Sequence, residues 1–183
     1  MTEKFGDALE RMTAVTDRHS AYFVIHLLNH QVCLAHLLRE LQYLSDLNAG
    51  QDWPEKVAGL FREAIHERNS RPEAVIDKVP WTERLDRLLR QSVENLGKKF
   101  AALKKGLIKC RDYLFNFLED PIIPSDNNGS EQGIRKVKIK LNNSRTFRSE
   151  FGADAFLELH SVFETAKKHG KTPYNAVQAL FEV

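Results

Sequence analysis

The chain has 183 residues, of which 42% are hydrophobic and 28% charged, and its formal net charge is +2. This composition is typical of a globular protein, and no apolar run of about 18 residues could span a bilayer. Cys33 and Cys110 are too few for a disulfide framework, and the N-terminus lacks the apolar stretch of a signal peptide. We therefore expect a cytoplasmic protein without a membrane partner.

The first predicted elements are an amphipathic helix over residues 3–11 and a short buried strand over residues 12–16. The strand is partly β-branched, and Asp17 follows it directly. Asp17 is therefore expected at the carboxyl end of a strand, the edge at which open α/β sheets bind their ligands. After Ser20, residues 21–28 are predicted to be helical. Residues 30–34 are predicted to form either a second strand or the entry to the next helix.

A helical region is predicted from residue 34 to about residue 120. Apolar side chains at helical spacing predict one helix that ends near Asn48 and another from Trp53 to about residue 70. A long helix is predicted from Trp81 to Leu118, because its apolar residues alternate steps of four and three, as in a coiled-coil seam. These residues are Leu96, Phe100, Leu103, Leu107, Cys110, Leu114 and Phe117. We expect an antiparallel hairpin with the 54–70 helix, although an ordinary bundle core would give the same pattern.

The C-terminal part begins with a polar motif, SDNNGSE, over residues 125–131. A helix is predicted from Asn128, with Glu131, Arg135 and Lys138 on one face. The face predicted to point inward carries Ile134, Val137 and Leu141. After it we expect a polar turn over 142–144, a possible strand over 145–147, and helices over about 151–169 and 174–181.

Six basic side chains and no acidic one follow this motif between Ile134 and Arg148. They are Arg135, Lys136, Lys138, Lys140, Arg145 and Arg148. The Glu131 carboxylate could hold a divalent cation, while the basic side chains could neutralise nucleic-acid phosphates. A plainer interpretation is a helix start followed by a solvated basic face. Asn128 would be the N-cap and Glu131 part of a capping box, or Asp126 or Asn127 would be the cap in another register.

Cys33 and His36 have the spacing of two zinc ligands. No second Cys/His pair follows at a suitable distance, so zinc is the least favoured interpretation. A buried structural pair on a helix is favoured, and a role for His36 in DNA binding is left open.

Four segments in order resemble the insertion-sequence-66 type of bacterial transposases. They are TDRHSAYF over residues 16–23, HQVCLAHLLREL over 30–41, SDNNGSEQGIRKVK over 125–138, and FGADAFLELHSVFETAKKHGKTPYNAV over 151–177. These transposases have a DDE active site on an RNase H-like fold. The resemblance implies that Asp17 is the second catalytic aspartate and Glu131 the catalytic glutamate, with a helical insertion between them.

The implied activity is metal-dependent cleavage and transfer of DNA strands. Asp17 and Glu131 would then be ligands of Mg²⁺ or Mn²⁺. The six basic residues after Glu131, together with His36, would contact the transposon ends, and the protein would be associated with the nucleoid. The alternative is a non-catalytic helical module that binds DNA or another transposase subunit.

The expected fold is mainly α with a small α/β remnant: an incomplete RNase H-like fold of one to three short strands with a large helical insertion. Residues 1–33 would form a partial RNase H-like segment, 34–120 the insertion, and 121–183 the return to the RNase H-like segment. The first aspartate of the family belongs on an earlier strand, and 16 residues precede Asp17. We therefore expect a truncated protein or a decayed reading frame that cannot cleave DNA alone. An exposed sheet edge would also favour homo-oligomers.

Overall fold

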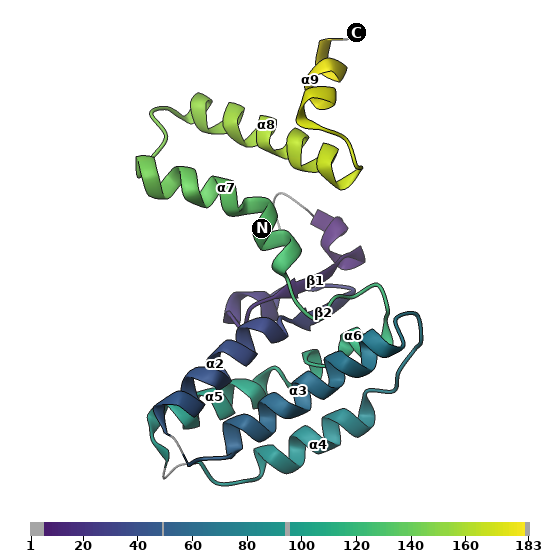
Figure 1. Ribbon diagram of the computed structural model, residues 1–183, viewed down its shortest axis with the longest axis vertical. Helices are drawn as coiled ribbons and strands as arrows, with labels where there is room; N and C mark the ends of the chain where they lie inside the picture. Colours follow the sequence, from purple (N-terminus) through teal and green to yellow (C-terminus); the bar gives the residue numbers. More distant parts are fainter. Residues whose placement is uncertain (1–5, 49, 94–95, 182–183) are drawn as a thin grey trace. The chain divides into compact units, whose positions relative to one another are not determined.

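The computed structural model describes residues 6–48, 50–93 and 96–181. The chain divides into two compact units, residues 1–127 and 128–183, which we describe separately (Figure 1). Helices predominate, and the described residues contain one sheet of two short strands, so the prediction of a mainly α protein with a small α/β part is confirmed. No helix among the described residues is long and apolar enough to cross a membrane.

The sheet of the first unit consists of β1 (Thr13–Thr16) and β2 (Asn29–Val32). The two strands are parallel, and Thr16 lies opposite Val32. The strand predicted over 12–16 is therefore confirmed, but its predicted burial is wrong, since Thr13 is exposed and residues 14–16 are half-buried. Residues 30–34 contain both the second strand and the entry to the next helix. Because the strands are parallel, their carboxyl ends lie at the same edge of the sheet.

The connection from β1 to β2 contains a shorter helix than predicted. A 3-10 helix, Ser20–Val24, replaces the helix expected over 21–28. Its N-cap is His19, whose Nδ1 atom accepts a hydrogen bond from the amide of Ala21 at 3.3 Å. Gly6–Arg11, the described part of the helix predicted over 3–11, is also a 3-10 helix.

Gln31 attaches the sheet to the helical region. Its fully buried side chain donates from Nε2 to the carbonyls of Val32 at 2.7 Å and Leu114 at 3.0 Å. Its Oε1 atom accepts from the amide of Phe117 at 3.0 Å. These bonds satisfy a buried amide, and each group left unpaired there would cost about 1–3 kcal/mol.

The helical region contains α2 (Leu34–Leu47), α3 (Trp53–Ser70), α4 (Val79–Leu89), α5 (Lys98–Lys109) and the short α6 (Asn116–Glu119). Helix α3 packs against both α2 and α4 (Figure 1). Helices α2 and α3 match their predictions, and Pro54 lies in the first turn of α3, where its missing N–H is tolerated. Fully buried side chains such as Leu37, Leu41 and Phe61 form the core between them.

The prediction of a single helix from Trp81 to Leu118 is wrong. The structure has α4, α5, a 3-10 turn at Arg111–Tyr113 and α6 in this span. Gly97 caps α5 with a φ of 109°, a conformation that favours glycine and that interrupts the helical path. The predicted seam still faces the core, since these residues are buried: Phe100, Leu103, Leu107, Cys110, Leu114 and Phe117. The apolar period therefore reported burial in a bundle core, not one continuous helix.

Arg68 fixes the end of α3 and has no acidic partner among the described residues. Its buried guanidinium donates to the carbonyls of Phe117 at 2.9 Å and Ala74 at 2.6 Å, and also to that of Leu118. These carbonyls belong to α6 and to the turn after α3. One cationic side chain therefore caps two backbone segments of the core.

The second unit contains α7 (Asn128–Ser144), α8 (Glu150–Lys168) and α9 (Pro173–Phe181). Ser149 caps α8, because its hydroxyl oxygen accepts from the amide of Gly152 at 3.0 Å. Gly170 follows α8 with a φ of 70°, as expected for a helix stop. The helices predicted over about 151–169 and 174–181 are confirmed within one residue.

Two details of the predicted second unit are wrong. Residues 142–144 continue α7 instead of forming a turn, and residues 145–147 are irregular instead of forming a strand. The described residues of α7 include none that is buried, and Ile134 is 50% exposed on the face predicted to point inward. The aromatic ring of Phe147 packs against Phe156 of α8, with centroids 5.5 Å apart, which explains its apolar character.

Candidate active site

Asp17 lies at the carboxyl end of β1, as predicted, and its side chain is exposed. Its Oδ1 atom accepts a hydrogen bond from the amide of His19 at 3.0 Å. The hydroxyl of Thr16 donates to the Asp17 backbone carbonyl at 2.8 Å. Within the described part of the chain, the second carboxylate oxygen has no hydrogen-bond partner. The turn therefore holds one oxygen of Asp17 and leaves the other available.

Cys33 and His36 lie at the corresponding end of β2. Cys33 is fully buried, and its amide donates to the carbonyl of Thr16 at 2.7 Å. The Nδ1 atom of His36, in the first turn of α2, lies 3.1 Å from the Cys33 sulfur. This geometry agrees with the interpretation of a structural pair. A role for His36 in DNA binding stays a prediction.

The chain returns to this edge of the sheet at Ser125. The carbonyl of Ser125 accepts a hydrogen bond from the amide of Leu34, the residue after Cys33, at 2.9 Å. The polar motif over 125–131 therefore begins beside the carboxyl ends of both strands. The Oδ1 atom of Asn127 is buried without a hydrogen-bond partner. Because α7 begins at Asn128, Asn127 directly precedes the helix, which corresponds to the alternative register of the cap.

Glu131 lies in the first turn of α7, in the second unit, whereas Asp17 belongs to the first. Glu131, Arg135 and Lys138 line one polar hollow of about 280 Å³ on α7. The predicted common face of the acid and the basic residues is therefore confirmed.

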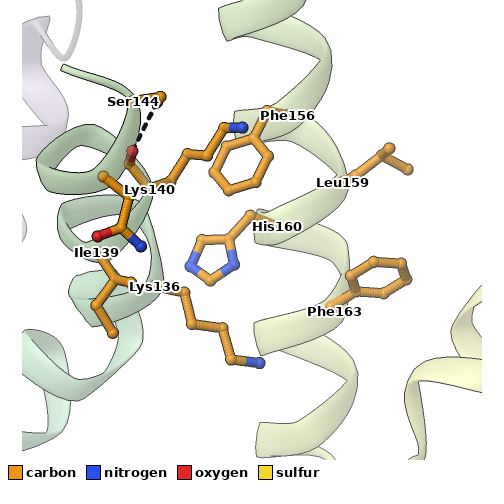
Figure 2. Close-up of a pocket in the computed structure, with 9 residues that line it drawn as sticks. Lys136, Ile139, Lys140, Ser144, Phe156, Leu159, His160 and Phe163 are labelled. Atoms are coloured by element: carbon orange, nitrogen blue, oxygen red, sulfur yellow. Dashed lines mark hydrogen bonds between the residues drawn. The ribbon is translucent and has the colours of Figure 1, made fainter. Parts of the chain in front are cut away.

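The six basic residues after Ile134 do not form one surface. All six are exposed, but only Arg135 and Lys138 share the face of Glu131. Lys136 and Lys140 instead line a pocket with residues of α8 (Figure 2). Arg145, with a φ of 58°, and Arg148 lie in the connection between α7 and α8.

A family model described as "Transposase IS66 family" matches residues 2–155. The chain belongs to the IS66 transposase family. The matched range of this transposase includes Asp17, Cys33, His36 and Glu131 and ends within α8. No curated protein and no solved structure matches the chain.

The donor chemistry of this IS66-family chain suits a hard cation. Asp17 and Glu131 carry carboxylate oxygens, the ligand type that Mg²⁺ and Mn²⁺ prefer. Among residues 6–48, 50–93 and 96–181, however, no group of three or more His, Cys, Asp or Glu side chains is arranged to hold a metal ion. Asp17 and Glu131 therefore have the ligand type that the metal needs. That both bind one metal site stays a prediction.

Sequence reasoning about this transposase missed the pocket between α7 and α8. The pocket combines Lys136 and Lys140 with Phe156, His160 and Phe163, which are distant in sequence. The basic run was visible, but its division between two helix faces depends on how α8 packs beside α7. A helical projection of both segments would have placed Lys136 and Lys140 on a different face of the helix from Arg135 and Lys138.

Proposed function

We propose that this chain is the C-terminal part of the catalytic region of an IS66 transposase, which cuts and joins DNA strands with a divalent metal. Asp17 and Glu131 are the proposed metal ligands and catalytic acids. The observation that carries the proposal is the hydrogen bond from the Leu34 amide to the Ser125 carbonyl. It supports the proposal because the segment leading to Glu131 starts at the sheet edge that carries Asp17.

The turn after β1 prepares Asp17 for this role. The His19 amide orients the carboxylate through Oδ1, and the Thr16 hydroxyl fixes the backbone of the same turn. A carboxylate held this way loses less conformational entropy when it binds a cation. Bound Mg²⁺ or Mn²⁺ would activate the attacking oxygen and stabilise the leaving oxygen of a phosphodiester.

The basic residues near Glu131 are proposed to hold the DNA backbone. Arg135 and Lys138 share the face of Glu131 and could neutralise phosphates beside it. Such contacts position a strand without reading its bases. Lys136, Lys140, Arg145, Arg148 and His36 are the further proposed DNA contacts, and transposon ends are the proposed partner.

Asp17 and Glu131 are two of the three acids that the resemblance assigns to the active site of the intact enzyme. We propose that this chain alone does not cleave DNA. The alternative function is a non-catalytic module that binds DNA or another transposase subunit. The exposed basic residues of α7 favour this alternative equally well, so metal binding is the property that separates the two.

The test is a titration of the purified chain with Mn²⁺, followed by electron paramagnetic resonance of the free ion. The wild type should bind Mn²⁺, and Asp17→Asn and Glu131→Gln should each weaken binding by at least about tenfold. Glu150→Gln is the matched control, because Glu150 is also an acid in the first turn of a helix of the second unit. Equal affinities for the wild type and both variants would refute the proposed metal site.

A second measurement identifies the alternative. DNA affinity that falls steeply with salt, and that Mn²⁺ and the two acid variants leave unchanged, would favour the non-catalytic module.

A further inference from the structure

A pocket of about 620 Å³ lies between α7 and α8, within the second unit (Figure 2). Its apolar lining comes from Ile139 of α7 and from Phe156, Leu159 and Phe163 of α8. This volume is in the range of small-molecule sites, about 300–1,000 Å³. The pocket is therefore large enough for a ligand with an aromatic ring.

The rings of Phe156 and His160 both line this pocket. They are almost parallel, with an interplanar angle of 9° and centroids 6.0 Å apart. The Nε2 atom of His160 donates to the carbonyl of Gly133 at 2.7 Å, which holds the imidazole against α7. Phe147 supports the other ring, since its centroid lies 5.5 Å from that of Phe156. Side chains fixed in this way suit stacking against a planar ligand.

The same pocket carries an excess of positive charge. Lys140 has no acidic partner among the described residues. Lys136 lies 3.7 Å from Glu164, but Glu164 also pairs with Lys167 at 2.7 Å, so two ammonium groups share one carboxylate. The neighbouring Lys167 lowers the pKa of Lys136. An anion bound beside Lys136 would relieve this repulsion between like charges.

We propose that this pocket binds one unpaired nucleotide of a DNA strand. Its base would stack on Phe156 and His160, and its phosphate would lie near Lys136 and Lys140. Aromatic side chains beside cations are the combination by which proteins bind single-stranded nucleic acid. The inference rests on the proposed function, because it names the form of DNA that the chain binds.

Two observations bear on the kind of base. Stacking tolerates any base, because each has an aromatic face. The Nε2 atom of His160 is already bonded to the Gly133 carbonyl, and the other residues of α8 that line the pocket, Phe156, Leu159 and Phe163, are apolar. We therefore expect little base preference.

The aromatic residues of α8 that line the pocket lie after residue 155, where the match to the family model ends.

The test compares three DNA probes by fluorescence anisotropy with the full chain. They are a blunt duplex, the duplex with a single-stranded overhang, and the same overhang with abasic sites, which keeps every phosphate. The overhang with bases should bind about tenfold more tightly than the abasic overhang. A 2-aminopurine in the overhang should change its emission on binding.

Variants locate the effect. Phe156→Leu keeps an apolar side chain but removes the aromatic face, and it should abolish the preference for bases. Phe151→Leu is the matched control, because Phe151 lies on the same helix, is 83% exposed, and is not in the pocket lining. Lys140→Gln should weaken binding to all three probes and lower the slope of the salt dependence by about one.

Each contrary result has a distinct meaning. Equal binding of overhangs with and without bases would overturn the pocket proposal and leave DNA binding intact. Failure of the wild type to bind any probe would overturn both the pocket and the DNA contacts of the proposed function. If Phe156→Leu abolishes self-association but not the base preference, the pocket is a contact between copies of the chain, and the proposal is wrong.

Discussion

The backbone carbonyl of Ser125 accepts a hydrogen bond from the amide of Leu34 at 2.9 Å. Leu34 begins α2 directly after Cys33, whose own amide bonds to the carbonyl of Thr16 at 2.7 Å. Three segments that are far apart in sequence therefore meet at one edge of a two-stranded sheet. This meeting gives the polar motif over 125–131 a structural context that a lone helix cap would not have.

DNA affinity should depend on the face of α7 that carries Glu131. The double variant Arg135→Gln/Lys138→Gln should weaken binding to a blunt duplex and reduce the slope of log affinity against log salt by about two. Lys56→Gln is the control, because Lys56 is exposed on α3 and pairs with Asp52. An unchanged slope in the double variant would remove these residues from the DNA interface.

Gln31 should be essential to the packing of the sheet against the helices. Gln31→Leu leaves the buried amide of Phe117 and the carbonyl of Leu114 without this partner, so we expect a loss of about 2–4 kcal/mol in the free energy of unfolding. Urea denaturation measures it. Gln42→Leu, on the exposed face of α2, should change stability by less than about 0.5 kcal/mol. Similar stabilities for both variants would contradict this role.

Arg68 should stabilise the core through carbonyl groups and not through an ion pair. Arg68→Met removes the donors to Phe117, Leu118 and Ala74, and should cost about 2–4 kcal/mol. Arg62→Met, on the same helix, breaks an exposed pair with Glu55 and should cost at most about 1 kcal/mol. Added salt should weaken the wild type little, since screening acts mainly on exposed pairs.

His30 should make stability depend on pH. Its ring packs against both Phe23 and Tyr113, and burial lowers its pKa below the ordinary 6.5. The unfolded state therefore binds a proton more readily than the folded state, and the free energy of unfolding falls as the pH drops below about 6.5. His30→Gln should lack this part of the decline. The exposed His169→Gln should retain it, and equal pH profiles for wild type and His30→Gln would contradict the prediction.

The two cysteines should be unreactive in the folded protein. Both are buried, and burial raises the pKa of the Cys110 thiol to about 11. A thiol reagent at about pH 8 should therefore react slowly with the native chain and rapidly with both cysteines in denaturant. Rapid labelling of Cys110 without denaturant would show that the core around α5 opens readily.

Much of the fold could be predicted from local sequence signals. The β-branched residues before Asp17 predicted β1, and Pro54 with its apolar stripe predicted α3. The single helix predicted from Trp81 to Leu118 was wrong because an apolar period reports which residues are buried. Buried side chains recur on both sides of the exposed Gly97, although the helix does not continue through it. The prediction of a strand near Phe147 was wrong because this apolar side chain packs against Phe156 of α8 and not in a sheet.

The sequence indicated the two acids of the candidate site, but not the contacts of the segments around them. Asp17 and Glu131 stood out by position, and their resemblance to a family agrees with the match over residues 2–155. The contact between Ser125 and Leu34 depends on backbone atoms, which carry no sequence signal. Lys136 and Lys138 lie in different pockets because α8 packs on one side of α7.

The central proposal is that Asp17 and Glu131 together bind a divalent cation. The most direct measurement is iron(II)-directed cleavage of the protein, in which iron(II) replaces Mg²⁺ and, with ascorbate and peroxide, generates radicals that cut the backbone beside its ligands. We predict cuts near both Asp17 and Glu131, and the loss of both cuts in either Asp17→Asn or Glu131→Gln. Cuts near one acid that persist without the other, or no cuts near either, would contradict a shared metal site.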